Sequence, residues 1–416
     1  MKRLEPNLER IHRDIIKMSD FTLPEESGYT RISFSLMDKQ ARKHIALLME
    51  DEAKLTIRID PAGNLIGRRE GRNQEPAILV GSHIDTVRGG GRFDGIAGVI
   101  AGIEVGRRFE EEGIRTIHPL EVAVFLAEEP SPFGISTIGS RGMVGKLSPD
   151  LLLSLRDDEG RTLGRAIREM GGDPERITEA KRSSGDIFSF LELHIEQGPL
   201  LSSRGIPIGV VTGIVGIVRG EIEVVGRNDH AGTTPMWDRK DALAAGAEVV
   251  LALEGVCKGL DGIVGTIGKI EISPNSLNVI PGTVTLGMEI RSLQKTLLNQ
   301  AISLFKDELD RIVKRRKITI NLKTKLSSKP VIFNSKMVGR IVRVCEKLNM
   351  PYLEVPSGAG HDANHLAEIT PTGMIFVPSK DGRSHCPEEW SEFKNIGLGV
   401  EVLANTIIEL DKEEAL

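Results

Sequence analysis

Three histidines and several carboxylates end or follow strand-like segments of this sequence. His83 and Asp85 lie in GSHIDT, directly after the apolar run of residues 77–80. In open α/β sheets, ligand-binding and catalytic groups gather at the carboxyl ends of the strands. A His-x-Asp pair there can be a metal ligand with a carboxylate that fixes its ring orientation. A hydrogen-bonded turn is the alternative interpretation.

Asp94 lies in GGGRFDG, at the predicted entrance to a helix. The glycines allow the backbone to approach a ligand closely. No Gly-Lys-Ser/Thr follows, so the segment is not a phosphate-binding loop. Taken alone, Asp94 fits a helix N-cap better than a metal ligand.

Glu128 and Glu129 end the apolar strand predicted over residues 121–127. Two carboxylates at a buried strand end are costly unless a cation neutralises them. One of them could then bind a metal ion while the other acts as a general base. A solvated acidic turn is the alternative.

Two further histidines follow the same pattern. His194 ends the strand predicted over 188–195, and His385 lies in a loop after the strand predicted over 373–377. Either could be a core histidine, but together four strands deliver His, Asp or Glu to one sheet edge. Paired metal ions activate water for hydrolysis, and such a thiolate-free donor set suits two ions of Zn²⁺, Mn²⁺, Co²⁺ or Ni²⁺.

The elements that must position these residues alternate between helices and buried strands. This alternation predicts an α/β domain with helices on both faces of its sheet. The pattern changes near Val210 to strand, helix, strand, strand, helix, strand, which matches a ferredoxin-like unit. We therefore expect an α/β catalytic domain of residues 1–209 and 327–416, interrupted by an α+β domain of residues 210–326.

Composition excludes several other classes of protein. The 416 residues contain 54 Lys plus Arg and 59 Asp plus Glu, and only 4% are aromatic, which argues against a nucleic-acid partner. The three cysteines form no CxxC pair, so a disulfide framework is not expected. The N-terminal segment is charged throughout, and no apolar stretch reaches the length of a membrane helix. A cytoplasmic protein with no membrane partner is expected.

The motifs GSHIDT, GGRFDG, HIEQGP and SHCPEEW, with NDHAGTTPM, LNVIPG and SGAGHDA, occur in one order. In this respect the chain, from about residue 30 to residue 405, resembles the amidase/hydantoinase/carbamoylase branch of the metal-dependent aminoacylase and carboxypeptidase superfamily. That branch includes N-carbamoyl-L-amino acid hydrolases, β-ureidopropionases and allantoate amidohydrolases.

The resemblance implies a role for each matching residue. It implies that Asp94 bridges two metal ions, that Asp85 supports His83, and that Glu128 is the general base. It implies that His230 stabilises the oxyanion and that the inserted domain dimerises, so that part of each pocket can come from a partner subunit. The implied metal ligands are His83, Asp94, Glu129, His194 and His385, and the implied substrate-binding residues are Gln197, Asn278, Arg291 and His361.

Some of these assignments also have support from the residues themselves. Arg291, near a strand end, is suited to clamp a carboxylate, although without the resemblance a surface salt bridge would be favoured for it. His230 lies in a polar loop with no apolar face to bury in. His365 stands four residues after His361, but HDANH lacks the Glu of HExxH, so a structural role is favoured for it.

One segment departs from the family pattern. The paired glutamates are followed by Pro130, Ser131, Pro132 and Phe133, where the family commonly has Gly, a small residue and Arg-Phe. The two prolines stiffen a loop beside the predicted base. This difference bears on the substrate and leaves the predicted metal ligands unchanged.

The expected function is hydrolysis of the ureido or amide C–N bond of a small carboxylate-bearing substrate by a homodimer. An N-carbamoyl-L-amino acid, giving the amino acid, ammonia and CO₂, is the first candidate. Allantoate is the nearest alternative, and an aminoacylase or dipeptidase would share the metal site. A metal-free binding module on the same scaffold is the alternative that is not an enzyme.

Overall fold

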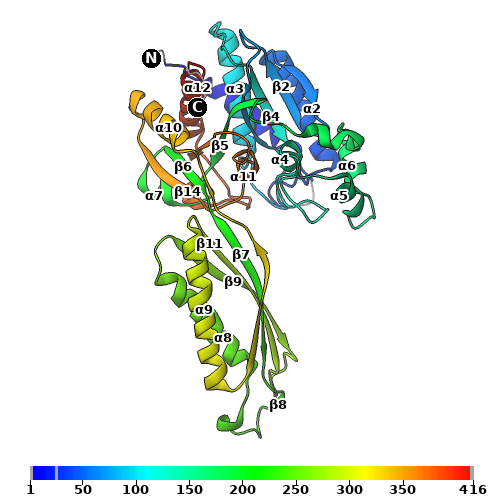
Figure 1. Ribbon diagram of the computed structural model, residues 1–416, viewed down its shortest axis with the longest axis vertical. Helices are drawn as coiled ribbons and strands as arrows, with labels where there is room; N and C mark the ends of the chain where they lie inside the picture. The colour runs from blue at the N-terminus through cyan, green and yellow to red at the C-terminus, as the bar shows by residue number, and fades with distance from the viewer. Residues whose placement is uncertain (1–2, 24–26, 413–416) are drawn as a thin grey trace. The chain divides into compact units, whose positions relative to one another are not determined.

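The computed structural model describes residues 3–23 and 27–412, and the chain divides into two compact units (Figure 1). Unit 1 comprises Met1–Thr212 and Phe333–Leu416, and unit 2 comprises Gly213–Ile332. The start of unit 2 lies three residues beyond the start of the predicted insert of residues 210–326, and its end lies six residues beyond the end of that insert.

Unit 1 contains a mixed sheet in the order β1-β2-β4-β3-β5-β15-β6, with β14 also paired to β6. The four central strands are parallel, whereas β2 and β6 pair with them antiparallel. Every residue of the central strands is buried, as expected for strands covered on both faces. The strands are β1 Thr56–Ile59, β2 Leu65–Arg69, β3 Ala77–His83, β4 Leu120–Phe125, β5 Ile187–Ile195, β6 Ile208–Ile214, β14 Tyr352–Ser357 and β15 Thr372–Val377.

Helices lie on both sides of this sheet. Leu193 of β5 faces α12, since a Cβ at Gly399 would lie 2.7 Å from its Cδ1. The preceding residue, Glu192, accepts a hydrogen bond from the backbone of Ala363 in α11 on the opposite face. The predicted α/β class is confirmed. The helices are α1 Leu8–Met18, α2 Leu36–Leu47, η1 Leu48–Glu52, α3 Ile96–Glu111, α4 Ile138–Met143, α5 Pro149–Ser154, α6 Leu163–Glu169, η2 Pro174–Ala180, α7 Leu200–Arg204, α10 Ser335–Lys347, α11 Ala363–Leu366, η4 Lys380–Gly382 and α12 Phe393–Leu410.

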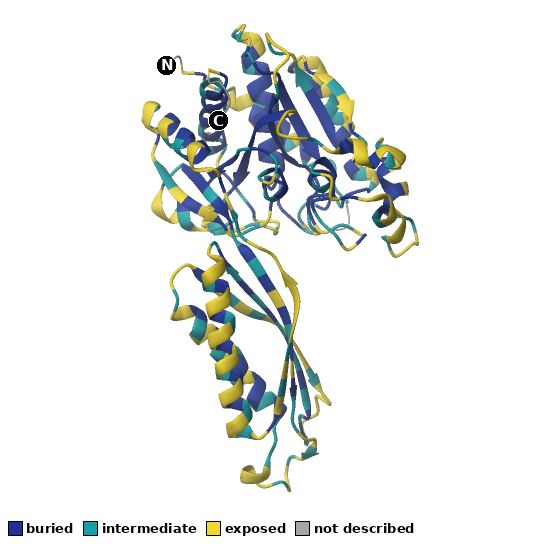
Figure 2. Cartoon of the chain, in the orientation of Figure 1, coloured by how far each residue is buried: buried dark blue, intermediate teal, exposed yellow. Residues whose placement is uncertain are grey.

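Unit 2 has the βαββαβ order expected from the sequence. Its antiparallel sheet runs β12-β7-β11-β9, the ferredoxin-like arrangement, and α8 and α9 pack against it over a core that includes Phe305 and Val249. Residues of β7 and β11 alternate in burial along each strand (Figure 2). The elements are β7 Gly216–Val225, β8 Asp229–His230, η3 Met236–Asp238, α8 Ala242–Lys258, β9 Ile263–Ser273, β10 Val279–Ile280, β11 Thr283–Ser292, α9 Lys295–Arg316, β12 Thr319–Ser327 and β13 Val331–Ile332.

Other sequence expectations can be compared with the described residues. No helix among them combines the length and the apolar character needed to cross a bilayer. Cys257, Cys345 and Cys386 are all free thiols. The helices between residues 138 and 180 were not predicted, because their short spans show too few periods of an apolar pattern.

Candidate metal and active site

His83 is the last residue of β3 and pairs with Phe125 in the parallel ladder with β4, which fixes its backbone. Its Nδ1 lies 3.0 Å from the carbonyl oxygen of Asp85. Its Nε2 points instead toward two carboxylates, 3.6 Å from Asp94 Oδ1 and 3.7 Å from Glu128 Oε2. An imidazole held at one nitrogen and facing carboxylates with the other is oriented as a metal-binding histidine usually is.

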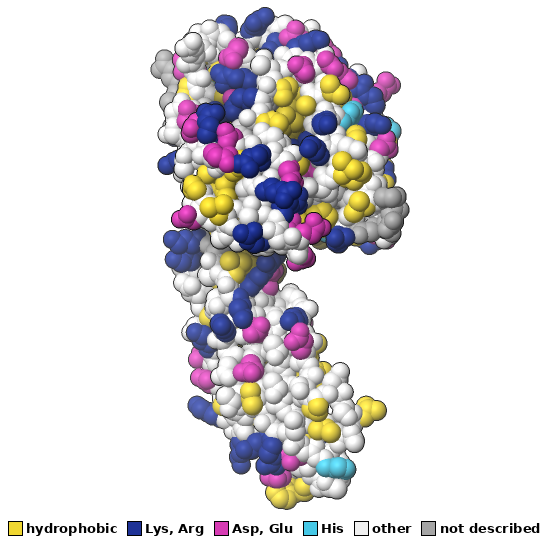
Figure 3. Space-filling model, turned by 90° about the vertical axis from the view of Figure 1, so that its right-hand side faces the viewer, with side chains coloured by type: hydrophobic (Ala, Val, Ile, Leu, Met, Phe, Trp, Pro, Cys, Tyr) yellow, Lys and Arg dark blue, Asp and Glu magenta, His cyan; other side chains and the backbone are white. Residues whose placement is uncertain are grey.

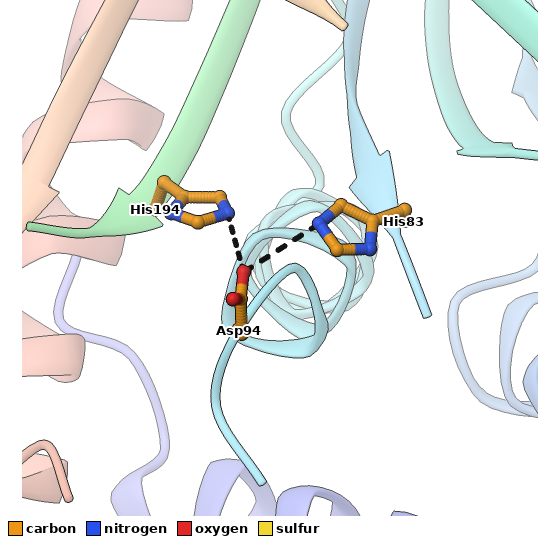
Figure 4. Close-up of side chains that lie close together, drawn as sticks. All are labelled: His83, Asp94 and His194. Carbon is orange, nitrogen blue, oxygen red and sulfur yellow. Dashed lines mark ion pairs between the residues drawn. The ribbon is translucent and has the colours of Figure 1, made fainter. Parts of the chain in front are cut away.

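Asp94 lies just before α3, and its carboxylate lies between the rings of His83 and His194 (Figure 4). Its Oδ1 is 3.1 Å from His194 Nε2, and His194 Nδ1 lies 2.9 Å from the carbonyl oxygen of Ile195. Gly95 follows with φ +67°, and a Cβ there would lie 2.5 Å from His83 Nε2. The glycine therefore makes room for the histidine. His83, Asp94 and His194 form a buried group whose ligand atoms lie within 4.8 Å of one another.

A second group uses the other oxygen of the same carboxylate. Asp94 Oδ2 lies 2.9 Å from His385 Nε2, which is 3.3 Å from Glu129 Oε1. Asp94, Glu129 and His385 also have ligand atoms within 4.8 Å of one another, so this group too could hold a metal ion. Asp94 is thus shared between two potential metal-binding groups, which is the arrangement that a bridging carboxylate requires.

Glu128 lies beside these groups. The Asp85 carboxylate accepts hydrogen bonds from the backbone N–H groups of Glu128, at 3.3 Å, and of Glu129, at 3.1 Å. Asp85 therefore positions the glutamate pair as well as lying near His83. Burial raises the pKa of Glu128 well above its usual range, and the adjacent Glu129 charge adds to the rise while His83 opposes it.

Charge in the site is concentrated and buried. Burial would raise the pKa of Asp94, but hydrogen bonds from His194, His385 and His83 outweigh it and hold that pKa well below its usual range. Hydrogen bonds to Asp94 and Glu129 raise the pKa of His385 to about 10. A carboxylate and imidazole cluster of this kind satisfies the donor requirements of a divalent cation.

Gln197 and His361 also lie at this site. The Gln197 side-chain amide donates to Asp94 Oδ2 at 2.8 Å and lies 3.2 Å from His385 Nε2. His361 is buried, with its ring centroid 4.5 Å from that of His194, and its Nε2 lies 2.8 Å from the Ser357 hydroxyl. Unit 1 therefore brings together every site residue that the sequence analysis placed in it.

The three remaining site residues belong to unit 2. His230 pairs with Val279 in the small β8–β10 sheet, and Asn278 accepts a backbone hydrogen bond from Ala231 at 2.9 Å, so His230 and Asn278 are neighbours. Arg291 lies at the other end of β11, eight residue steps beyond Thr283, where its Nε donates to Glu289. At about 3.4 Å per residue, those steps span about 27 Å. Thr283 pairs with Val225, five residues before His230, whereas Arg291 pairs with Ile217, so His230 and Arg291 of one chain lie toward opposite ends of β11.

One buried residue beside the site was not expected from the sequence. Glu389 accepts backbone hydrogen bonds from Phe93 and Asp94. His365, for which a structural role was expected, links Lys146 to Thr137. The repeated acid in SHCPEEW was a signal for Glu389, but nothing in the spacing shows which of the two glutamates faces inward.

Comparison with known proteins agrees with this geometry. The sequence profile described as Peptidase family M20/M25/M40 matches residues 79–409. An N-carbamoyl-L-amino acid amidohydrolase of Geobacillus stearothermophilus is 39% identical, over 98% of this chain and 99% of that protein. An allantoate amidohydrolase of Escherichia coli strain K12 is 33% identical, over 94% of this chain and 95% of that protein.

Solved structures lead to the same family. The crystal structure of a hydantoinase/carbamoylase family amidase from Burkholderia multivorans superposes with a TM-score of 0.93 at 32% identity, covering 99% of this chain and 100% of that one. The fold and these comparisons together define a hydrolase of the α/β class with an inserted ferredoxin-like unit. The chain belongs to peptidase family M20/M25/M40 and is an amidohydrolase of that family, which confirms the resemblance.

Proposed function

We propose that this protein is a two-metal amidohydrolase that cleaves the ureido or amide C–N bond of a small carboxylate-bearing substrate. The observation that carries the proposal is the Asp94 carboxylate, whose two oxygens face two separate donor groups. An N-carbamoyl-L-amino acid is the first substrate candidate, and the similarity to an amidohydrolase of that name supports it. Allantoate, another ureido carboxylate, is the second candidate because of the similarity to an allantoate amidohydrolase.

The donor set fits two divalent cations. His83 and His194 would hold one, Glu129 and His385 would hold the other, and Asp94 would serve both. Nitrogen and oxygen donors without thiolate suit Zn²⁺, Mn²⁺, Co²⁺ or Ni²⁺. When bound, such ions lower the pKa of a water molecule and polarise the carbonyl group that is attacked.

Glu128 is the proposed general base. Its backbone is held by Asp85, and its carboxylate lies next to the donor groups without belonging to either of them. Glu128 takes a proton from the attacking water and delivers it to the leaving nitrogen, which becomes ammonia when the substrate carries a carbamoyl group. Gln197, which donates to Asp94, fixes the orientation of that carboxylate.

Unit 2 supplies the groups proposed to bind substrate. His230 Nδ1 accepts hydrogen bonds from the backbone N–H groups of Gly232, at 3.0 Å, and Thr233, at 3.2 Å, so the neutral ring carries its proton on Nε2. That N–H is suited to stabilise the developing oxyanion. Arg291 is suited to bind the substrate carboxylate, and its planar guanidinium can do so with two hydrogen bonds.

These two roles require two chains. A small substrate cannot touch His230 and Arg291 of the same unit 2, because Arg291 lies about 27 Å along β11 from Thr283, at the end of the strand far from His230. We therefore propose a homodimer in which each active site uses His230 and Asn278 of one subunit and Arg291 of the other. Three apolar side chains near His230 and Asn278 in sequence support this proposal, because they leave apolar surface for a partner: Met236, Trp237 and Leu277 are 78%, 84% and 104% exposed. Figure 3 shows hydrophobic side chains on the surface at the lower end of the view.

Substrate and base are tested by ammonia release. The panel comprises N-carbamoyl-L-amino acids, allantoate, ureidopropionate and N-acyl amino acids, each with added Mn²⁺, Co²⁺, Zn²⁺ or Ni²⁺. Turnover of the carbamoyl compounds supports the first candidate, and turnover of allantoate alone supports the second. Glu128→Gln should bind metal as the wild type does and lose at least about 100-fold in kcat. A Glu128→Gln variant with wild-type kcat contradicts the assignment of the base.

The shared site is tested by mixing variants. His230→Ala and Arg291→Ala should each be nearly inactive. If subunits exchange freely, half of the dimers are mixed, and each has one intact site, so about a quarter of wild-type activity should return. A mixture that stays inactive after subunit exchange contradicts the proposed sharing.

On the sequence grounds given above, we place this activity in the cytoplasm.

A further inference from the structure

A buried carboxylate outside both donor groups connects the two parts of the chain that carry Asp94 and His385. Glu389 is only 2% exposed. Its Oε1 accepts hydrogen bonds from the backbone N–H groups of Phe93, at 2.9 Å, and Asp94, at 3.1 Å. Its Oε2 accepts a hydrogen bond from the Ser384 hydroxyl at 2.6 Å. All three partners donate, which matches an ionised carboxylate that only accepts.

The backbone around Glu389 is shaped to receive it. A Cβ on Gly91 would lie 2.0 Å from Glu389 Oε1, so only glycine fits at that position without a shift. On the other side of the contact, the rings of Phe93 and Trp390 meet edge to face with centroids 5.3 Å apart. The loop before α3 and the loop after η4 are therefore packed together at Glu389.

The two donor groups differ in what supports them. His83 and His194 lie at the ends of β3 and β5, where ladder hydrogen bonds hold the backbone. His385 lies in a loop and has φ +56°, a left-handed conformation that costs a residue other than glycine about 1 kcal/mol or more. Its side chain is also 48% exposed. The sheet thus builds the first group, whereas the second needs a separate support.

Glu389 provides that support from both sides. Its bond to Ser384 braces the residue before His385, and its bonds to Phe93 and Asp94 brace the residue whose Oδ2 faces His385. We propose that Glu389 is a positioning residue that assembles the second divalent-cation site, formed by Asp94, Glu129 and His385, and leaves the first site to the strands. This inference rests on the proposed function, which requires two ions.

The test is titration of the metal-stripped, full-length protein with Mn²⁺ in a calorimeter. The wild type should bind two ions. Glu389→Ala should bind one ion with unchanged affinity and the second at least 10-fold more weakly, the size of effect known for residues that orient metal ligands. Glu389→Gln should recover part of the loss, because its amide oxygen can still accept the two backbone N–H groups. Glu388→Ala removes the neighbouring exposed acid, which pairs with Arg383, and should bind as the wild type does.

The outcomes separate this inference from the function it rests on. Wild-type protein that binds no Mn²⁺ overturns the two-metal proposal and this inference together. If the wild type binds two ions, the inference alone is overturned when Glu389→Ala binds both ions with unchanged affinity, or loses affinity for both to the same extent. If Glu389→Ala does not fold, Ser384→Ala tests the same support from the His385 side. It removes the hydroxyl that donates to Glu389 Oε2 at 2.6 Å and to Asp94 Oδ2 at 3.4 Å, keeps the bonds from Phe93 and Asp94 to Glu389, and should weaken the second ion selectively.

Discussion

The protonation of His365 should make the stability of unit 1 depend on pH in a predictable way. Lys146 donates to its Nδ1 across 3.1 Å, and its Nε2 lies 3.0 Å from Thr137 Oγ1. An ammonium can only donate, so Nδ1 accepts and the ring is neutral. Burial, and then the charges of Arg141 and Lys146, lower the pKa of His365 to about 3.

The sign and the size follow from the two pKa values. The unfolded chain takes up a proton at His365 with a pKa near 6.5, whereas the folded chain takes it up near 3. Stability is therefore fully present above pH 6.5 and is lost as the pH falls toward 3. Between pH 7.5 and pH 5.0, proton uptake by the unfolded state costs about 2 kcal/mol. Any folded pKa below about 4 gives the same figure, because the folded state then binds almost no proton at pH 5.

Urea unfolding of His365→Gln measures this directly. Gln can donate to Thr137 and accept from Lys146, but it does not titrate. The chain has two tryptophans, so in a Trp237→Phe background Trp390 alone reports on unit 1. A chelator removes the pH dependence of metal binding from the comparison. The background protein should lose about 2 kcal/mol more than His365→Gln between pH 7.5 and pH 5.0.

The background protein, measured at the same two pH values, provides the control. If the free energies of unfolding of His365→Gln and the background protein change with pH by the same amount, to within about 0.5 kcal/mol, His365 is not held neutral. The reasoning from burial and neighbouring charge would then be refuted.

Three further predictions follow from other parts of the structure. Phe305→Ala should destabilise unit 2 by about 3–5 kcal/mol, because the ring is fully buried in its core; calorimetric unfolding measures the loss. Gly91→Ala should weaken the second Mn²⁺ as Glu389→Ala does, because its Cβ would meet Glu389 Oε1, and the same titration checks it. Treatment with a chelator should abolish ammonia release, and Mn²⁺ should restore it, as a two-metal mechanism requires; activity that survives complete removal of metal excludes that mechanism.

The sequence predicts the edge of the sheet well because strand ends leave a clear signal. An apolar run followed at once by His, Asp or Glu occurs at β3, β4 and β5, and these strands are parallel neighbours. Their polar ends therefore meet, and the structure indeed places His83, Glu129 and His194 around Asp94. Unit 2 is predicted equally well, since its amphipathic elements follow one another in a recognised order.

Contacts between distant polar residues leave no such signal. Asp85 was expected beside His83, yet its carboxylate also accepts the backbone N–H groups of Glu128 and Glu129. Glu389 reaches Asp94 across 295 positions of the chain. Periodicity reports which face of an element is buried, but it does not report which carboxylate meets which N–H group. These partners become visible only when the loops are in place.

Arg291 lies near the end of β11, far from His230 of the same chain. The separation of His230 from Arg291 is fixed inside unit 2, so it holds however unit 2 lies relative to unit 1. The proposed metal donors, in contrast, all belong to unit 1 of a single chain. A dissociated monomer should therefore keep its Mn²⁺ affinity and lose its ammonia-releasing activity. Dilution that lowers specific activity in step with dimer content, at constant metal affinity, is the expected result, and full specific activity in a demonstrated monomer would contradict the shared site.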